Sequence, residues 1–157
     1  MPYKVVEDNI ENALIYSYKL LNYRDRSRNE LYERLIKKGF SEEISIKTVT
    51  HLEEKGFIDD KKLAMSLLRD ASQRKYLGKM GLRSYLVNKG LSQDIIDNLQ
   101  CEEYDEIEIA KRLIEKKMKN MKNLDKFKFK QRISGLLLRR GFSYDTIHNM
   151  LRTFKET

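Results

Sequence analysis

The pattern of hydrophobic residues recurs three times along the chain, with a spacing of 51 residues between copies. Aliphatic side chains stand eight, four and three residues before each of three glycines, and a serine stands two residues after each one. The glycines are Gly39, Gly90 and Gly141. Apolar residues at i, i+4 and i+5 predict one buried face of a helix. Each copy therefore predicts an amphipathic helix that ends at its glycine.

The residues around each glycine also predict how the next helix begins. Glycine adopts the left-handed conformation that ends a helix, and the basic residue before it suits the negative end of the helix dipole. Ser41, Ser92 and Ser143 are then expected to be N-caps of a following helix. An acidic residue two positions after each serine complements the positive end of that helix dipole. Each copy thus predicts two helices connected by a turn at the glycine.

A further amphipathic stretch precedes each predicted helix pair, around Ala13, Ala64 and Ala110. Ala13 and Ala64 lie 26 residues before their glycines, whereas Ala110 lies 31 residues before Gly141, so the third copy has a longer connector. The chain is therefore predicted to be all-α, with three tandem three-helix repeats and about nine helices. The predicted repeats span 8–58, 59–100 and 103–157. Stacked units of this kind form a long edge, so we expect one elongated, curved body over residues 1–157.

Acidic and basic residues are concentrated in different parts of the chain. The 157 residues carry a net charge of +8, and 36% of them are charged. Residues 1–60 have a net charge of −2, while 61–100 and 101–157 have +5 each. Between 111 and 140, twelve basic residues stand against two acidic ones. Such segregation favours a polyanionic partner, nucleic acid first, or an acidic protein surface over a solvated lysine-rich face.

Basic residues also recur at equivalent positions, one and eleven residues before each glycine. Together with the arginines near residue 25 and the basic stretch of the third repeat, they form the set of candidate binding residues. That set is Arg24, Arg26, Arg28, Lys38, Lys79, Lys89, Lys117, Lys119, Lys126, Lys128, Lys130, Arg132, Arg139 and Arg140. Four nearby tyrosines are expected to fill the edge of the core rather than to stack on bases. They are Tyr16, Tyr18, Tyr23 and Tyr32.

Several other classes of protein are disfavoured. No apolar run approaches the roughly 18 residues of a membrane span, and the N-terminus lacks a signal-peptide core, so we expect a cytoplasmic protein. The lone Cys101 excludes an internal disulfide and is expected to be an inert thiol. His51 and His148 lack a second ligand at metal spacing. No glycine-rich nucleotide loop is present. We therefore expect no catalytic residue, cofactor or metal, and no enzymatic activity.

Several short motifs occur in a defined order and spacing along the chain. They are Arg24-Asp25-Arg26-Ser27 with Glu30-Leu31, Leu35 to Phe40, Gly56-Phe57-Ile58-Asp59-Asp60 with Leu63-Ala64, Gly78-Lys79 through Leu82, Leu86 to Gly90, and Arg139-Arg140-Gly141-Phe142-Ser143-Tyr144-Asp145. Together these motifs resemble the RecX family along essentially the full chain. One departure is Tyr85, where the family usually has a glutamate.

This resemblance implies a function without catalysis. RecX proteins bind the filament of the RecA recombinase in its helical groove, limit its extension or activity, and can bind DNA directly. The resemblance thus implies a modulator, most simply an inhibitor, of filament growth, ATPase and strand exchange in recombination, DNA repair and the SOS response. The implied partners are the RecA filament and single- and double-stranded DNA, and we expect a monomer. The alternatives are a helix-turn-helix protein that acts on duplex DNA without a recombinase, and a general helical-repeat scaffold for proteins.

Overall fold

The computed structural model describes residues 6–99, 104–121 and 124–154. Within these ranges the regular structure consists of helices, without a strand. Residues up to 65 together with 87–97 form one compact unit, here unit 1, and residues 66–86 together with those from 98 onward form unit 2. None of the helices in the described ranges has the length and apolar character that crossing a membrane requires. Cys101 lies outside the described residues.

The described residues contain nine α-helices and one short π-helix, η1, so the predicted all-α repeat pattern is confirmed. The helices of the first repeat are α1 (Ile10–Tyr23), α2 (Arg28–Lys38) and α3 (Glu42–Glu54). Those of the second are α4 (Asp60–Asp70), η1 (Ala71–Lys75), α5 (Lys79–Asn88) and α6 (Gln93–Asp97). Those of the third are α7 (Glu106–Met118), α8 (Lys126–Arg139) and α9 (Tyr144–Thr153).

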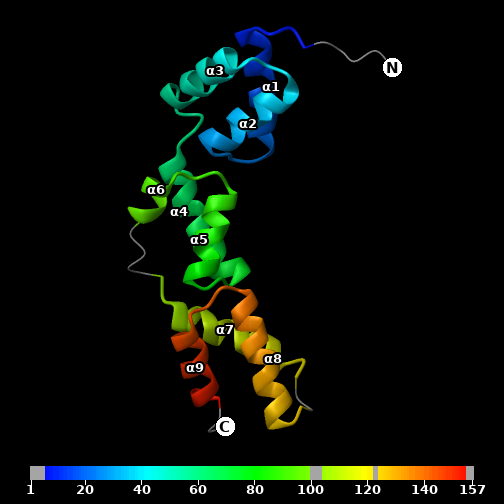
Figure 1. The fold of residues 1–157 in the computed structure, drawn as a ribbon, viewed down its shortest axis with the longest axis vertical. Coiled ribbons are helices and arrows are strands. Elements are labelled where there is room, and N and C mark those ends of the chain that lie inside the picture. The colour runs from blue at the N-terminus through cyan, green and yellow to red at the C-terminus, as the bar shows by residue number, and fades with distance from the viewer. Residues whose placement is uncertain (1–5, 100–103, 122–123, 155–157) are drawn as a thin grey trace, which may run out of the picture. The chain divides into compact units, whose positions relative to one another are not determined.

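In unit 1, helices α1, α2 and α3 pack against one another (Figure 1). Their core is formed by the periodic apolar residues, among which Ala13, Leu31 and Leu35 are fully buried. Tyr16 and Tyr18 contact Phe40 and Phe57 respectively at the edge of this core. The expectation that tyrosines fill the core edge is therefore confirmed for these two and for Tyr32, but it is wrong for Tyr23, which is 83% exposed.

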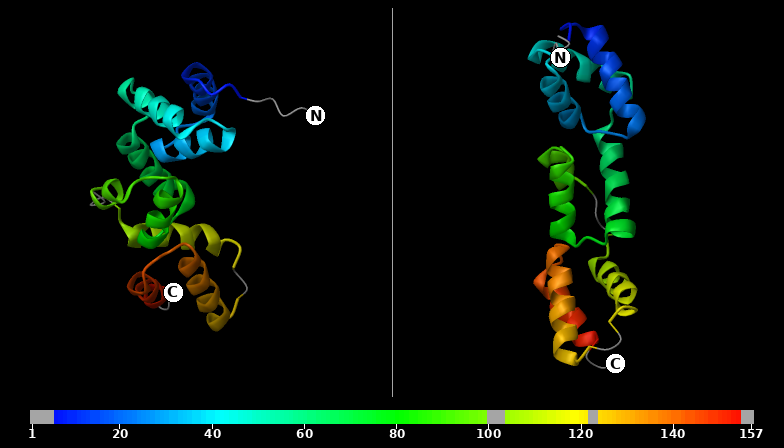
Figure 2. Two further views of the ribbon diagram at one scale, coloured as in Figure 1. Left: turned by 45° about the horizontal axis from the view of Figure 1, so that its top comes forward. Right: turned by 90° about the vertical axis from the view of Figure 1, so that its right-hand side faces the viewer.

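In unit 2, helix α9 packs against both α7 and α8, as the two views of Figure 2 allow the reader to follow. Ala110, Leu113, Ile133 and Leu137 are buried there, at the positions that the periodicity marks as apolar. Burial of such side chains provides most of the stability of short helices, because isolated helices of this length are marginal in water.

The predicted turns are confirmed at all three glycines. Gly39, Gly90 and Gly141 have φ values of +108°, +81° and +74°. The serine two residues later accepts a hydrogen bond from a backbone N–H of the following helix in each copy, at 3.3, 3.4 and 3.2 Å. A left-handed glycine followed by a serine N-cap therefore forms each of the three turns.

One column of the predicted buried face is wrong. The aliphatic residues three positions before each glycine are Ile36, Val87 and Leu138, and they are 39%, 49% and 52% exposed. Since one residue turns the helix by about 100°, position i+4 returns close to i, whereas i+5 lies on the flank of the face. The buried stripe is thus narrower than the sequence pattern suggested.

In unit 2, the start of α5 lies directly against the turn between α8 and α9. The backbone N–H groups of Gly78 and Met80 donate to the carbonyls of Arg140 and Gly141, at 2.9 and 3.1 Å. A Cβ atom on Gly78, Gly81 or Gly141 would overlap backbone atoms across this contact. Glycines are therefore required on both sides, because only they let the two backbones approach so closely. We call this contact the unit 2 joint.

The Glu106 side chain completes the unit 2 joint. Its Oε1 accepts hydrogen bonds from the backbone N–H groups of Lys79, at 2.8 Å, and Ser143, at 3.2 Å. Its Oε2 accepts from the hydroxyls of Ser143, at 2.8 Å, and Thr146, at 2.6 Å. Although burial raises the pKa of Glu106, these hydrogen bonds outweigh it and hold the pKa below its ordinary value.

Unit 1 contains the equivalent contact, between the start of α2 and the turn after α5, here called the unit 1 joint. The Ser27 hydroxyl donates to the carbonyl of Lys89, at 2.6 Å, and accepts from the backbone N–H of Glu30, at 3.1 Å. Asp60 accepts from the backbone N–H of Arg28, at 2.9 Å. A side chain thus makes the contact that glycine backbones make in unit 2.

Candidate binding surfaces

The arginines near residue 25 are largely committed within unit 1. Arg26 is 7% exposed and pairs with Glu30, and Arg24 pairs with the same carboxylate at 2.5 Å. Burial raises the pKa of Glu30, but the hydrogen bonds and charges of both arginines prevail and hold the pKa below its ordinary value. This triad fixes the entry into α2.

Arg28 is also held by its own unit. Its guanidinium donates to Glu53 Oε2, at 2.6 Å, and to the Thr50 hydroxyl, at 3.0 Å. Its position in the first turn of α2 sets a cation against the helix dipole, and the Glu53 carboxylate compensates for it. The first basic cluster is therefore mainly an internal network of ion pairs.

The basic residues that stand one or eleven positions before the three glycines differ in their surroundings. The Lys38 ammonium lies 5.5 Å from the centre of the Tyr16 ring. Lys79 is exposed, while Lys89 is half-buried at the unit 1 joint. The Arg140 guanidinium donates to the backbone carbonyl of Lys75. These repeated positions thus combine a structural role with partial exposure.

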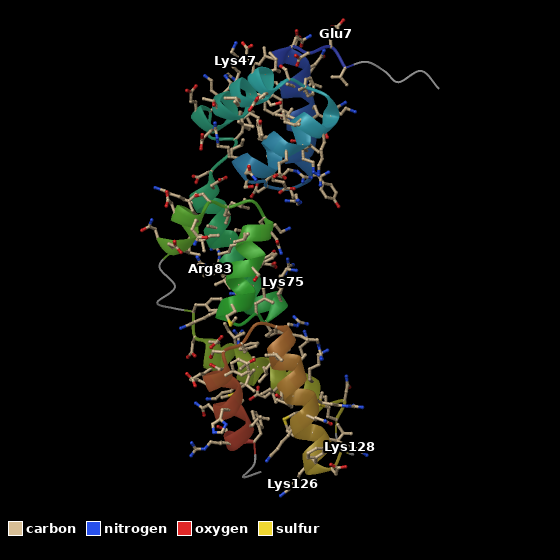
Figure 3. The ribbon with its side chains drawn as sticks, in the orientation of Figure 1. Glu7, Lys47, Lys75, Arg83, Lys126 and Lys128 are labelled. Carbon is tan, nitrogen blue, oxygen red and sulfur yellow. The ribbon has the colours of Figure 1, made fainter. Side chains whose placement is uncertain are left out.

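The basic stretch of the third repeat lies at the end of α7 and along α8, in unit 2. Lys126 and Lys128 occupy the N-terminal end of α8 (Figure 3), where Lys128 lies 3.7 Å from Asp125. The other candidates from this stretch make no ion pair with a described residue. They are Lys117, Lys119, Lys126, Lys130, Arg132 and Arg139. This surface is therefore the largest group of uncompensated positive charges among the candidates.

Gly135 gives this basic surface a hollow. A cavity of about 470 Å³ lies beside it, lined by the three cations Lys117, Arg132 and Arg139 and by the apolar Leu136. A Cβ atom on Gly135 would lie 3.3 Å from an Arg139 guanidinium nitrogen. Glycine costs about 1 kcal/mol in a helix interior relative to alanine. The three cations around the cavity make it suited to an anion.

One basic cluster was not predicted from the sequence. The Arg112 guanidinium and the Lys116 ammonium lie 5.8 and 5.1 Å from the centre of the Tyr76 ring. Tyr76 has a left-handed φ of +50° directly after η1, and Lys75 approaches the Tyr85 ring at 5.1 Å. No local motif signals a π-helix, so the sequence offered no means of placing these side chains together.

Tyr85, the departure from the family pattern, has a defined role in unit 2. Its hydroxyl donates to Asp70 Oδ2 at 2.9 Å. The ring therefore links α5 to the end of α4.

Comparisons with known proteins agree with this architecture. Family models described as the first and the third three-helix domains of RecX match residues 13–52 and 103–151. The crystal structure of RecX from Lactobacillus salivarius superposes with a TM-score of 0.78 at 23% identity, covering 96% of this chain and 99% of that chain. At that identity the likeness shows the fold alone.

Sequence relatives extend the match. The regulatory protein RecX of Pelodictyon phaeoclathratiforme is 31% identical over 94% of this chain and 92% of its own length. The regulatory protein RecX of Chlorobium limicola is 32% identical over 92% of this chain and 91% of its own length. With both terminal repeats matched by family models, the chain belongs to the RecX family of regulatory proteins.

Proposed function

We propose that this chain is a non-enzymatic regulator that binds the RecA filament on DNA and inhibits its growth, ATPase and strand exchange. Membership of the RecX family supports a regulatory role. The observation that supports a DNA contact is the cavity at Gly135, where Lys117, Arg132 and Arg139 converge without a carboxylate partner among the described residues. A phosphate group matches that positive charge.

Repetition supports the proposed mechanism. Both joints display a basic residue one position before the glycine, Lys89 in unit 1 and Arg140 in unit 2. Each of these two joints then offers a similar contact to one subunit of a helical filament. Linked contacts add through high effective concentration, so that modest individual affinities are sufficient for stable binding.

The primary test is the ATPase activity of RecA on single-stranded DNA while this protein is titrated in. We expect activity to fall. Loss at well below one copy per recombinase subunit indicates capping of filament growth, and loss only near saturation indicates occupancy of the groove or competition for DNA. Unchanged ATPase with this protein shown to be folded contradicts the proposal.

The DNA contact has its own test. Substituting glutamine for Lys117, Arg132 and Arg139 should weaken single-strand binding and reduce the log–log salt slope by about 0.7 for each phosphate that the variant no longer binds. Glutamine at Lys47, Lys61 and Lys62 removes the same charge elsewhere and is the matched control. A slope that falls equally in both variants contradicts a phosphate site at Gly135.

A second candidate is a helix-turn-helix protein that acts on duplex DNA alone. It is favoured by the three turns in which a capping serine opens a second helix, at Ser41, Ser92 and Ser143. Such a protein reads base edges and prefers defined sites. Footprinting on random duplexes separates the two functions, because a defined operator favours this candidate and uniform protection favours the filament regulator.

A further inference from the structure

Unit 1 contains a cavity of about 620 Å³ at the unit 1 joint. Its apolar walls include Tyr32, Ile46 and Val87, and its polar groups include Arg28, Asp60 and Ser92. Cavities of this volume accept a ligand or a side chain rather than a single water molecule. The basic cavity at Gly135 lies in unit 2 and is a different site.

The repeats show what normally fills this position. Asp60 and Glu106 both stand four residues before the buried alanine of their helix, Ala64 or Ala110. Glu106 accepts four hydrogen bonds, two of them from Ser143. Asp60 accepts one hydrogen bond, from the backbone N–H of Arg28. In the described structure no hydrogen bond joins Asp60 to Ser92.

Two differences in sequence explain the open joint. Asp60 is one methylene group shorter than Glu106, and Ile95 occupies the position at which Thr146 supplies a hydroxyl. In the first repeat, by comparison, Asp8 accepts a hydrogen bond from the backbone N–H of Ser41 at 2.9 Å. Within the residues described, only the second repeat therefore has a capping serine that donates no hydrogen bond to a carboxylate.

The electrostatics of the cavity favour a cation. Burial raises the pKa of Asp60, and the carboxylates of Glu53 and Asp59 raise it further against the lowering influence of Arg28. The Arg28 guanidinium is already bound to Glu53 and Thr50. The half-buried Asp60 carboxylate therefore retains unused acceptor capacity beside a guanidinium that is already paired.

We propose that this cavity binds an arginine side chain of the protein partner, with its guanidinium on the Asp60 carboxylate and its aliphatic stem between Val87 and Ile46. The identity of that partner as the RecA filament rests on the proposed function, whereas the chemistry of the cavity does not. Guanidinium suits the site better than ammonium, because it offers several donors in one plane and a flat face for the Tyr32 ring. A nucleic acid does not suit it, because its phosphates would meet a carboxylate.

The first test compares two neighbouring carboxylates. Asp60→Asn keeps the acceptor for the Arg28 N–H but removes the charge from the cavity, whereas Asp59→Asn removes the same charge outside it. We expect Asp60→Asn to weaken binding to filaments on single-stranded DNA at least about tenfold, because one partner of a desolvated charge pair is removed. Asp59→Asn should change the affinity by less than about twofold. Equal affinities of the two variants overturn the proposal.

A second variant satisfies the cavity's carboxylate within the protein without weakening the fold. Asp60→Glu combined with Ile95→Thr recreates the Glu106 and Thr146 pair and directs the carboxylate to Ser92. We expect this variant to unfold no more easily than the parent and yet to bind the filament at least about tenfold more weakly. Binding equal to that of the parent overturns the proposal.

The third test uses no recombinase, so that it separates this inference from the proposed function. N-acetyl-arginine methylamide is titrated into the full chain while backbone amide NMR shifts are followed. We expect saturable shifts at Gly90, Leu91 and Ser92 that Asp60→Asn abolishes and that the lysine analogue reproduces only weakly. Shifts no larger than those from N-acetyl-alanine methylamide overturn the inference, even if the filament is bound. Saturable shifts without filament binding preserve the cavity and refute RecA as the partner.

Discussion

The two joints solve one problem with different chemistry. In each, the start of one helix lies against the turn that ends a later helix, so that unpaired backbone groups at both helix ends need partners. In unit 2 the backbones of Gly78 and Gly141 touch, and Glu106 binds both sides. In unit 1 the Ser27 hydroxyl bridges the gap, and Asp60 binds one side only.

This difference shows that an identical fold does not require an identical interface. The unit 2 joint is closed and satisfied, so it serves stability. The unit 1 joint leaves acceptor capacity and a cavity, so it remains available for binding. Substitutions at equivalent positions should therefore have unequal effects.

The largest effect is expected at the glycine contact. Gly141→Ala should lower the free energy of unfolding by about 3 kcal/mol, because the added methyl overlaps the backbone of Gly81 and alanine is strained in the left-handed conformation. Gly39→Ala meets open space and should cost only the strain, about 1 kcal/mol. Urea unfolding followed by circular dichroism measures both. Equal losses would mean that the close approach contributes nothing.

Neutralising the two carboxylates should have opposite effects on how stability depends on pH. Glu106→Gln should cost about 2 kcal/mol at pH 7, because acceptors for buried donors are removed. Since the pKa of Glu106 lies below its ordinary value of 4.5, its contribution is present above pH 4.5 and disappears as the pH falls through the lowered pKa. Urea titrations at pH 7 and in acid should therefore show the variant and the parent converging. A gap that persists at low pH would contradict this assignment.

Asp60→Asn should change stability at pH 7 by no more than about 0.5 kcal/mol. Because the pKa of Asp60 lies above its ordinary value of 3.8, ionisation of Asp60 opposes folding once the pH rises above 3.8. The asparagine variant should therefore gain stability relative to the parent as the pH rises from about 3 to 7. A relative loss over this range, seen in the same titrations, would show that Asp60 is a stabilising ion-pair partner.

Converting one joint toward the other sharpens the comparison. Asp60→Glu with Ile95→Thr should raise the free energy of unfolding by about 1 kcal/mol, the net value of an added hydrogen bond. Either substitution alone should achieve less, since each supplies only part of the network. A double-mutant cycle by thermal unfolding measures this coupling. Strict additivity would mean that the new side chains do not meet.

The smallest effects are expected in the exposed aliphatic column. Val87→Ala and Leu138→Ala, one near each joint, should each lower stability by no more than about 0.5 kcal/mol, because both side chains are about half exposed. Differential scanning calorimetry is sufficient to compare them with the parent. A large loss for Val87→Ala alone would indicate that this side chain is packed more tightly than Leu138.

The sequence by itself determined the helices and their ends. Periodic apolar residues, left-handed glycines and serine caps act within one or two turns of the chain, so Gly39, Ser41 and Leu35 could be placed without a fold. The same reasoning wrongly placed Ile36 on the buried face. A periodic pattern shows which residues are apolar, but it does not show how much of the helix surface the neighbouring helices cover.

Only the tertiary structure decided which groups meet across the joints. Gly78 and Gly141 are far apart in the sequence, and each looks locally like an ordinary turn residue. Nothing local in the sequence distinguishes Glu106, whose partners Ser143 and Thr146 reach it only through the fold. Arg26 looked like a surface cation, yet it is buried against Glu30. Helix signals are local, whereas close backbone approach, buried hydrogen bonds and the open site at Asp60 depend on the path of the whole chain.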